Sequence, residues 1–547
     1  MKNIGKKQVN VSEKTFSIDA FEKYDYVIFL FYTITLLIIN LINHKIGDYG
    51  VETDFFWMYV PEAKKILSGT LPIDQFRGPF YPIVLAIFKF IIGDFFKAGI
   101  VINTISAGLT LYLLDKILKN YFSKFVAFFT TVFVAFNPVF IQYSYSCGTD
   151  MLFLALIMSS IYFFVSENKY NLIFSGIFAG FAYLTRYNGI FLILATLLTL
   201  LINFILEKDY KSFVKKISLY LIPFIIVILP WGLYTKSEKG EFFYNQNYLN
   251  TAYEFQQNKV SWDEYWQSHK DIHSIWDIFS SSPSYFIEKV FSNLYRNYVL
   301  DIHRLLFATD VDEALKFNEQ NLSINLLHIV ILLSLGLLLI KTLIPSEPNK
   351  LKEKFNFYSF RLYLILNFIL YAIILTLIFY SERFNLFLIP FYGLAVFFTL
   401  EKITSKAKFA GIVLSSILVI YIAKASYNYN EKQISIGPEE VLQAAEWINN
   451  NKLPKTKIIA RKPHIAYYTD MKFEVIPVFN SIEDLTKKLV ETDADYIFIS
   501  NMELSSRPFF QEIMTKENLS RFPMLSQKLE IIYSNEYPLF IIYKIKK

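Results

Sequence analysis

Apolar runs long enough to enter a membrane recur along the first 425 residues and then stop. A helix needs roughly 20 apolar residues to cross a bilayer, and slightly fewer where the bilayer is thin. The pattern therefore predicts a polytopic α-helical membrane protein. The candidate runs are 25–43, 79–93, 98–118, 122–141, 150–166, 171–185, 188–206, 217–235, 324–341, 360–380, 384–400 and 408–425.

Lysine-rich loops predict the sidedness of these runs, because short cytoplasmic loops carry the excess of Lys and Arg. The N-terminal segment 1–24 and the link around Lys116 are both rich in lysine, so both belong inside. Only one crossing besides 25–43 then fits before Lys116. We therefore expect the proline-containing run 79–93 to be interfacial or re-entrant, which leaves about eleven spans and a cytoplasmic N-terminus.

The same solution places the long polar loops 44–97 and 236–323 on the outer face, together with everything after the last span. Residues 25–430 are then a transmembrane domain, and 431–547 are a soluble extracytoplasmic α/β domain of ordinary domain size. Short strands are predicted at 457–461, 473–478, 495–499, 529–533 and 539–545, and helices at 438–450, 482–491 and 508–519.

Composition excludes several classes of protein. Of 547 residues, 54% are hydrophobic and 19% are charged, whereas soluble domains carry about a quarter charged residues. The net charge of +6 is modest for this length and shows no clustered basic face of the kind that binds nucleic acid. A single cysteine excludes an internal disulfide and a cysteine-based metal site. No cleavable secretory signal precedes the first run, so we expect an integral protein of a prokaryotic plasma membrane.

Two carboxylates, Glu52 and Asp54, stand two residues apart just beyond the first membrane helix. An extended stretch would direct both side chains to one side, as an acidic pocket at the membrane surface requires. The alternative is a solvated acidic loop.

Several short motifs on the outer face occur in a recognisable order. They are the acidic loop ending at Asp54, Arg77-Gly78-Pro79-Phe80-Tyr81-Pro82, Gly148-Thr149-Asp150, Leu184-Thr185-Arg186 and Glu382-Arg383-Phe384. This set resembles the GT-C glycosyltransferases that use polyprenyl-phosphate sugars, and most closely their protein O-mannosyltransferase-like and aminoarabinose-transferase-like branches. The resemblance covers about the first 430 residues and, more loosely, the C-terminal domain.

The resemblance implies a catalytic base in the first outer loop, which by position is Asp54, with Glu52 and Asp150 supporting the acidic site. A carboxylate there can accept the proton that a hydroxyl or amine acceptor loses as it attacks the sugar. The departing phosphate needs positive charge or hydrogen-bond donors. Candidate substrate-binding residues are Arg77, Arg186, His303, Arg304 and Arg383 with its neighbour Glu382, and Tyr59 and Tyr81 for stacking on sugar rings.

Each candidate also has a structural interpretation. Arg186 and Arg383 lie at helix ends, where an arginine can extend to the lipid headgroups, and Glu382-Arg383 can be a plain ion pair. Asp150 can cap a helix beginning at Met151, or hold a divalent metal together with Asp54. His303 and Arg304 belong to an amphipathic segment, Arg77 can simply anchor its loop, and the tyrosines can belong to the interfacial aromatic belt.

The leading hypothesis is an inverting transferase that moves a hexose or pentose from a polyprenyl-phosphate carrier to a lipid, glycan or protein acceptor at the outer face. Phe55 to Tyr59 replace the Glu and Arg-Tyr that follow the aspartate in the aminoarabinose branch, so the sugar stays open, as does a metal requirement. The alternatives are a polytopic transporter or lipid-sugar flippase, and a scaffold protein. Transporters tend to show repeated halves with polar residues at the midplane, and this chain shows no such repeat.

Overall fold

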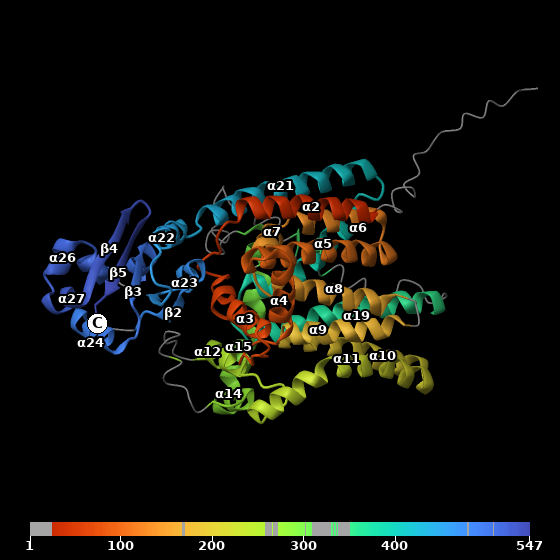
Figure 1. Ribbon diagram of the computed structural model, residues 1–547. Helices are drawn as coiled ribbons and strands as arrows, with labels where there is room; N and C mark the ends of the chain where they lie inside the picture. The colour runs from red at the N-terminus through yellow and green to blue at the C-terminus, as the bar shows by residue number, and fades with distance from the viewer. Residues whose placement is uncertain are drawn as a thin grey trace, which may run out of the picture.

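The structure is a computed structural model of the chain and describes residues 25–166, 170–256, 272–300, 302–308, 351–477, 481–506 and 508–546, with isolated positions 265, 330, 331, 333, 334 and 336. A bundle of long helices forms one part of the molecule. A smaller α/β domain sits beyond one end of the bundle (Figure 1).

Within the described residues, six helices are long and apolar enough to cross a membrane. They run roughly side by side in Figure 1. Their bounds are α2 (Asp25–Asn43), α5 (Phe95–Tyr121), α10 (Ile190–Glu207) with η2 (Tyr187–Gly189) before it, α11 (Tyr210–Lys239), α20 (Ile389–Ile403) preceded by η4 (Glu382–Leu388), and α21 (Lys408–Ser435).

The predicted span 122–141 is not one straight helix, which corrects the sequence-based expectation. Helices α6 (Lys124–Ala135) and α7 (Pro138–Tyr145) meet at an angle of 55°. The side chain of Asn137 accepts a hydrogen bond from the amide of Phe140 and so caps α7. Pro138 has no N–H and fits the first helical position. An Asn-Pro pair inside an apolar run therefore ends one helix and starts the next.

Four further helices have apolar stretches of 10–17 residues, namely α4 (Phe80–Ile92), α8 (Asp150–Val165), α9 (Asn171–Thr185) and α19 (Leu351–Leu375, whose apolar part is 359–375). The 13 residues of α4 extend about 20 Å, less than the roughly 30 Å of a hydrocarbon core. The predicted span 324–341 lies outside the described residues except for isolated positions. The number of eleven spans stays a prediction.

Small residues bring some of these helices very close together. Gly176 and Gly180 lie one turn apart on α9 and face α11. A Cβ atom added at Gly176 would lie 2.2 Å from the carbonyl oxygen of Tyr220. Membrane helices gain their association largely from such close packing, because lipid tails are as apolar as the side chains they would replace.

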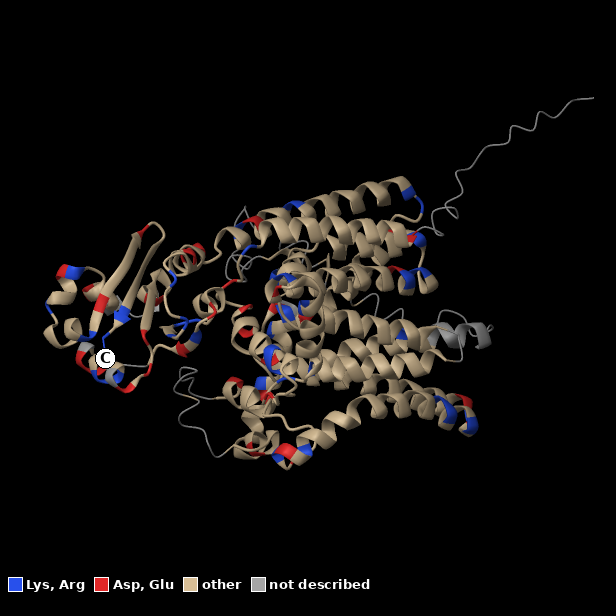
Figure 2. Cartoon of the chain, viewed as in Figure 1, with Lys and Arg blue, Asp and Glu red and all other residues tan. Residues whose placement is uncertain are grey.

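The start of α2 lies beside the lysine-rich end of α5. Asp25, at the start of α2, forms ion pairs with Lys116 (3.4 Å) and Lys119 (2.7 Å) near the end of α5. The start of α2 and the lysine-rich end of α5 therefore share one end of the bundle, in agreement with the charge pattern. Figure 2 shows charged residues at the two ends of the bundle and in the α/β domain, while the middles of the helices are largely free of charge.

The opposite end of the bundle carries short helices from the two long polar loops. The first loop contributes η1 (Phe55–Tyr59) and α3 (Val60–Leu67), followed by α4. The second loop contributes α12 (Tyr248–Glu254), α14 (Ile275–Ser281), α15 (Pro283–Tyr295), η3 (Arg296–Leu300) and α16 (Ile302–Phe307).

The C-terminal domain contains a mixed five-stranded sheet in the order β2-β1-β3-β5-β4. β1 (Lys457–Ala460), β2 (Lys472–Val475) and β3 (Tyr496–Ser500) are parallel, and β5 (Leu539–Ile545) joins β3 and β4 (Leu529–Glu536) antiparallel. All five predicted strands are confirmed. The predicted helices at 438–450 and 482–491 are α22 (Glu439–Asn450) and α24 (Ile482–Glu491), whereas 508–519 is wrong as one helix and forms η5 (Pro508–Ile513) and α26 (Lys516–Ser520).

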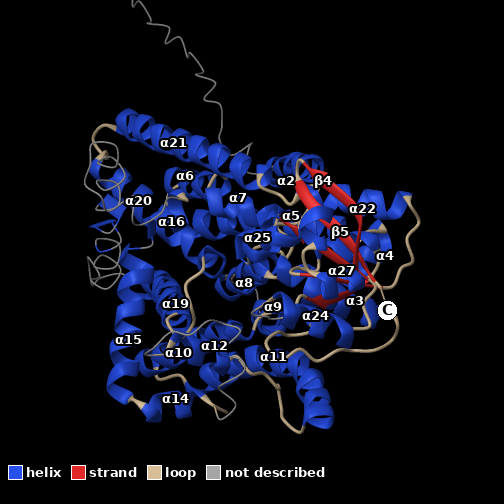
Figure 3. Ribbon diagram, turned by 90° about the vertical axis from the view of Figure 1, so that its left-hand side faces the viewer, coloured by secondary structure: helices blue, strands red, loops and turns tan. Residues whose placement is uncertain are grey.

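Both faces of this sheet are covered. Residues of α22 and of α23 (His464–Thr469) pack on one face, and Ile46 of the first outer loop joins their hydrophobic cluster. Residues of α24 and of α27 (Pro523–Lys528) pack on the other face, where α25 (Asn501–Ser506) also lies close by. Figure 3 shows the strands lying across the end of the helical bundle. The first outer loop is therefore part of the core of a domain that lies some 400 residues later in the chain.

Candidate active site

Asp54 lies at the N-terminal end of the π-helix η1. One of its carboxylate oxygens, Oδ2, lies 2.9 Å from Nη2 of Arg77 and 3.7 Å from Nη1 of Arg383. These two arginines come from the motif before α4 and from the start of η4. The Asp54 side chain keeps 35% of its surface exposed, so a partly open carboxylate is flanked by two cations.

The loop around Arg77 holds its guanidinium in place. Nη1 of Arg77 lies 3.6 Å from Oδ2 of Asp74, and the guanidinium carbon lies 5.3 Å from the ring centre of Tyr59. A Cβ atom at Gly78 would lie only 1.9 Å from the carbonyl oxygen of Leu184. Gly78 therefore lets the loop reach the end of α9, which explains why glycine follows the arginine.

A second ion pair joins the other two outer motifs. Arg186, at the end of α9, pairs with Asp150 at the start of α8, and its guanidinium carbon lies 4.9 Å from the ring centre of Phe384. The helix begins at Asp150 itself, after Thr149, so the prediction that Asp150 caps a helix beginning at Met151 is wrong. The Asp150 carboxylate is committed to an arginine.

Glu52 does not join Asp54, which corrects the expectation of an acidic pair on one side. The segment from Val51 forms a turn leading into helix, not an extended stretch, so the two side chains diverge. Glu52 is fully buried. Its carboxylate lies 2.9 Å from Nε2 of His44 and accepts hydrogen bonds from the amides of Asp48 (2.9 Å) and Cys147 (2.5 Å).

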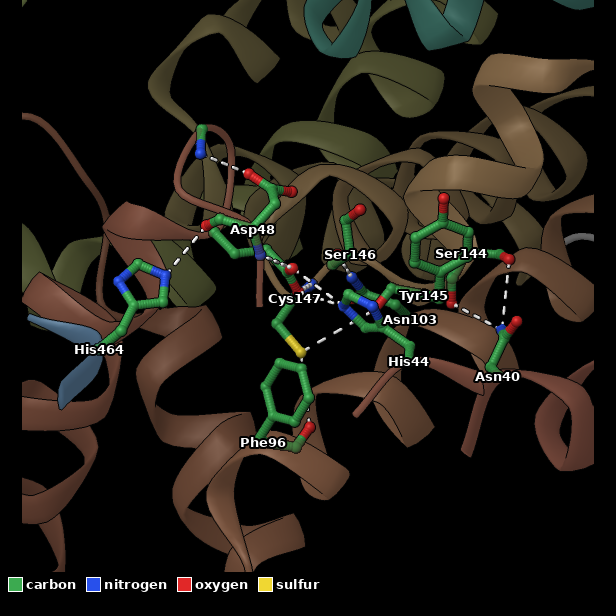
Figure 4. Close-up of polar contacts among 12 residues, drawn as sticks. Asn40, His44, Asp48, Phe96, Asn103, Ser144, Tyr145, Ser146, Cys147 and His464 are labelled. Atoms are coloured by element: carbon green, nitrogen blue, oxygen red, sulfur yellow. Dashed lines mark hydrogen bonds and ion pairs between the residues drawn. The ribbon is translucent and has the colours of Figure 1, made fainter. Parts of the chain in front are cut away.

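Figure 4 shows His44, Asp48 and Cys147 gathered in this polar cluster, with His464 of the C-terminal domain beside Asp48. The cluster joins the end of α2, the first outer loop and the connection between α7 and α8. Glu52 is therefore a positioning residue that fixes the base of the loop carrying Asp54.

The aromatic candidates are buried. Tyr59 is 5% exposed and Tyr81 is fully buried, and their ring centres lie 4.9 Å apart in an edge-to-face contact. Neither ring is open to a sugar. Trp57 is 42% exposed and lies edge-on to Phe473 of β2, with ring centres 5.2 Å apart.

The remaining candidates lie near the same end of the bundle. Glu382 opens η4 beside Arg383, and Arg304 belongs to α16. The amide of Asn137 donates to the carbonyls of Leu305 (3.0 Å) and Leu306 (3.3 Å), which ties α16 to the bend between α6 and α7. The side chain of His303 lies outside the described part of the chain.

Two buried acids beneath Arg77 were missed from the sequence. Glu62 and Asp74 are 7% and 6% exposed and line one small cavity with Arg77. Burial, reinforced by the nearby Asp74, raises the pKa of Glu62 to about 8. Glu62 sits on the buried side of α3, five residues after Trp57, and an acid facing inward on an amphipathic helix is the signal that could have identified it.

A divalent metal would need oxygen ligands free to converge on one point. Among the residues that the structure describes, no three His, Cys, Asp or Glu side chains are grouped in that way. Asp54 and Asp150, the pair named as candidate ligands, are each paired with an arginine. These residues do not fit a metal.

Residues 76–233 match the family model described as dolichyl-phosphate-mannose-protein mannosyltransferase. The match begins at the arginine motif and ends within α11. It confirms the predicted resemblance to the polyprenyl-phosphate-dependent glycosyltransferases of the GT-C type. No curated protein sequence is significantly similar.

Three solved structures are similar in fold. ArnT from Cupriavidus metallidurans bound to undecaprenyl phosphate shares 11% identity over 95% of this chain and 97% of that chain, with a TM-score of 0.45. The same protein in the apo state also shares 11% identity, over 96% and 98%, with a TM-score of 0.47. The oligosaccharyltransferase of Archaeoglobus fulgidus, tethered to an acceptor peptide, shares 11% identity over 97% and 75%, with a TM-score of 0.48.

Proposed function

We propose that this chain is an inverting glycosyltransferase that moves a sugar from a polyprenyl-phosphate carrier to an acceptor at the outer face of the membrane. The observation that carries the proposal is the partly exposed carboxylate of Asp54 between Arg77 and Arg383. The family match over residues 76–233 covers Arg77, Asp150 and Arg186 and supports a glycosyltransferase.

In the proposed reaction, the hydroxyl or amine of the acceptor attacks the anomeric carbon of the sugar. The bond from that carbon to the phosphate oxygen breaks, and the phosphate leaves with the electron pair. Asp54 takes the proton that the acceptor loses, since a positioned carboxylate can act as a general base. A single displacement of this kind inverts the configuration at the anomeric carbon.

The two arginines serve the leaving group. Phosphate is already a good leaving group, so no second carboxylic acid is needed to protonate it, unlike in glycoside hydrolysis. Arg77 and Arg383 place guanidinium groups where negative charge develops on the departing phosphate. Because both also contact Asp54, they hold the base and the leaving group in one geometry.

The acceptor in this proposal belongs to one of three classes of molecule. A lipid, a glycan or a protein at the outer surface can approach Asp54 from the side that remains exposed, and the hexose or pentose stays to be identified. In this proposal the N-terminus is cytoplasmic and the C-terminal domain is extracytoplasmic in the plasma membrane. A transporter or flippase is not favoured, because the arginine pairs of the outer motifs gather at one end of the bundle.

Transfer by the purified full chain in liposomes tests the proposal. We expect Asp54→Asn to lower the transfer rate by about 100- to 10,000-fold, the range that general-base catalysis contributes, when a panel of radiolabelled polyprenyl-phosphate sugars is supplied. Asp493→Asn is the matched control. Its side chain is 76% exposed on the C-terminal domain, and exposed ion pairs contribute little to stability.

Turnover by the Asp54→Asn variant at the rate of the wild type would refute the assignment of the base. If neither protein binds a polyprenyl phosphate nor turns over any donor in the panel, the proposed function itself fails.

A further inference from the structure

The first outer loop occupies the place where the sheet of the C-terminal domain would ordinarily bind a ligand. At the carboxyl ends of β1 and β3 the chain connections diverge, because β1 is followed by β2 on one side and β3 is followed by β4 and β5 on the other. In open α/β sheets, ligands bind at such a switch point. Here Nε2 of His464 hydrogen-bonds the carbonyl of Asp48 at 3.0 Å, and the hydroxyl of Tyr49 donates to Glu440 at 3.1 Å.

The loop after β1, residues 461–463, is held in place from two sides. The buried carboxylate of Glu503 accepts hydrogen bonds from the amides of Ser500 (2.7 Å) and Arg461 (3.3 Å). On the membrane side, the ring of Phe56 lies 4.5 Å from that of His464. Residues 461–463 are thus held between the sheet and η1, which begins next to Asp54.

Lys462 is the residue that this arrangement brings to the candidate site. Its side chain is half-buried, and its ammonium interacts electrostatically with Asp54 and Asp48. Burial, together with repulsion from Arg461, lowers the pKa of Lys462, and the attraction of the two carboxylates offsets only part of this effect. An anion that binds nearby would stabilise the charged form of this ammonium.

The arginines of the site are already engaged. Arg77 is shared between Asp54 and Asp74, and Arg383 approaches Asp54. A phosphate bound by these two alone would share both of its cations with the base. A third cation on another element allows the phosphate to bind while Asp54 keeps its partners.

We propose that Lys462 of the C-terminal domain binds the phosphate group of the lipid-linked donor and so adds to the site a cation from a different domain than Arg77 and Arg383. The inference rests on the proposed function and deepens it. The C-terminal domain then contributes a residue to donor binding, and its switch point serves to hold the first outer loop.

Binding of polyprenyl phosphate to the full chain in nanodiscs tests this inference. We expect Lys462→Gln to raise the Kd about tenfold, the usual loss for one hydrogen bond to a charged group, and Lys462→Arg to stay within about threefold of the wild type. Lys544→Gln is the matched control, because Lys544 is exposed on β5 of the same domain. Thermal melting of each variant verifies that it is folded.

Two further probes identify the source of the phosphate. Polyprenol, which lacks phosphate, should bind the wild type and Lys462→Gln equally. Inorganic phosphate should compete with polyprenyl phosphate only weakly if the lipid is the true ligand, whereas strong competition in the wild type alone would assign Lys462 to a free phosphate. In transfer assays, KM for the donor should rise in Lys462→Gln more than kcat falls.

An unchanged Kd in folded Lys462→Gln overturns the inference. If Arg77→Gln and Arg383→Gln weaken binding in the same experiment, the proposed function survives without Lys462. If the wild type itself does not bind polyprenyl phosphate, the failure lies in the proposed function. If Lys462→Gln does not fold, the Kd of Lys462→Arg becomes the test. Arginine also carries a positive charge, so a tenfold rise in Kd for the folded Lys462→Arg variant would contradict the proposed phosphate contact.

Discussion

Two acidic residues only two positions apart, Glu52 and Asp54, have different surroundings in this protein. Asp54 is partly exposed between two arginines, while Glu52 is buried and holds His44 and two backbone amides. The sequence identified both as acids of the first outer loop. It could not separate them, because the turn that begins at Val51 is specified by distant partners such as Cys147.

A buried acid beneath the site makes stability depend on pH. The pKa of Glu62 is about 8 in the folded protein because of burial, and 4.5 is its ordinary value. Between these values the folded state holds a proton that the unfolded state has released. The free energy of unfolding therefore falls as pH rises from 4.5 toward 8, and the contribution is fully present only below about pH 4.5.

Glu62→Gln should remove this dependence, since an amide keeps the shape of the protonated acid and does not ionise. We expect the variant to unfold at the same temperature as the wild type at pH 4.5 and to be more stable by on the order of 3 kcal/mol by pH 8. Thermal melting at a series of pH values measures the difference. Glu446→Gln, on an exposed position of α22, is the control, and a parallel shift in both variants would contradict the assignment to Glu62.

At the scale of elements, apolar runs predicted where most membrane helices lie but not where they break. The bend at Asn137 depends on a single cap and on the partner helix α16, whose carbonyls Asn137 also binds. Mean hydropathy is taken over a window of many residues, so it does not reveal a break that depends on one polar residue. In the C-terminal domain the five strands were predictable because each is a short run with aromatic or β-branched residues. The segment 508–519 divides because tertiary packing overrides its helical pattern.

The packing of α9 against α11 should tolerate almost no added volume. A methyl group at Gly176 would meet the backbone carbonyl of Tyr220 at 2.2 Å, and one at Gly180 would meet the side chain of Val227 at 2.8 Å. Cβ of Val227 is fixed to the backbone, so α11 must give way in both cases, but the longer distance at Gly180 requires a smaller displacement. We expect Gly176→Ala to lower the melting temperature more than Gly180→Ala, with a cost of about 1–3 kcal/mol.

Thermal unfolding in one detergent, with both variants at equal concentration, provides the measurement. Because the two substitutions add the same methyl group to the same face of one helix, any difference reports how closely α11 approaches each position. Equal losses would show that α11 moves as a unit to accommodate either methyl group.

At the scale of the molecule, the C-terminal domain and the first outer loop form one unit although some 400 residues separate them. Ile46 lies in the core of the domain, and His464 and Tyr49 join its edge to the loop. The sequence indicated an outer α/β domain and an acidic loop as separate features. Their contact depends on surfaces that no local pattern encodes, although Arg461-Lys462 at the end of a predicted strand was a signal that sequence analysis could have used.

The proposed orientation can be tested with engineered cysteines, because the only native cysteine, Cys147, is buried. We expect a membrane-impermeant maleimide to label Lys544→Cys in intact cells and Lys406→Cys only after the membrane is opened. Lys544 lies on the C-terminal domain, and Lys406 lies in the short lysine-rich link before α21. The unmodified chain is the control, and the reverse labelling pattern would place the candidate site in the cytoplasm.

The helix that carries the C-terminal domain also fixes the rotation and the height of the sheet relative to the membrane. α21 runs unbroken from Lys408 to Ser435, and only Ile436, Gly437 and Pro438 separate it from α22. One residue inserted into such a helix would rotate everything beyond it by about 100° and advance it by about 1.5 Å. Seven residues would nearly restore the angle but carry the domain about 10 Å away. Anyone who transplants this domain onto another bundle must therefore conserve the length of α21 as strictly as the residues that the domain presents.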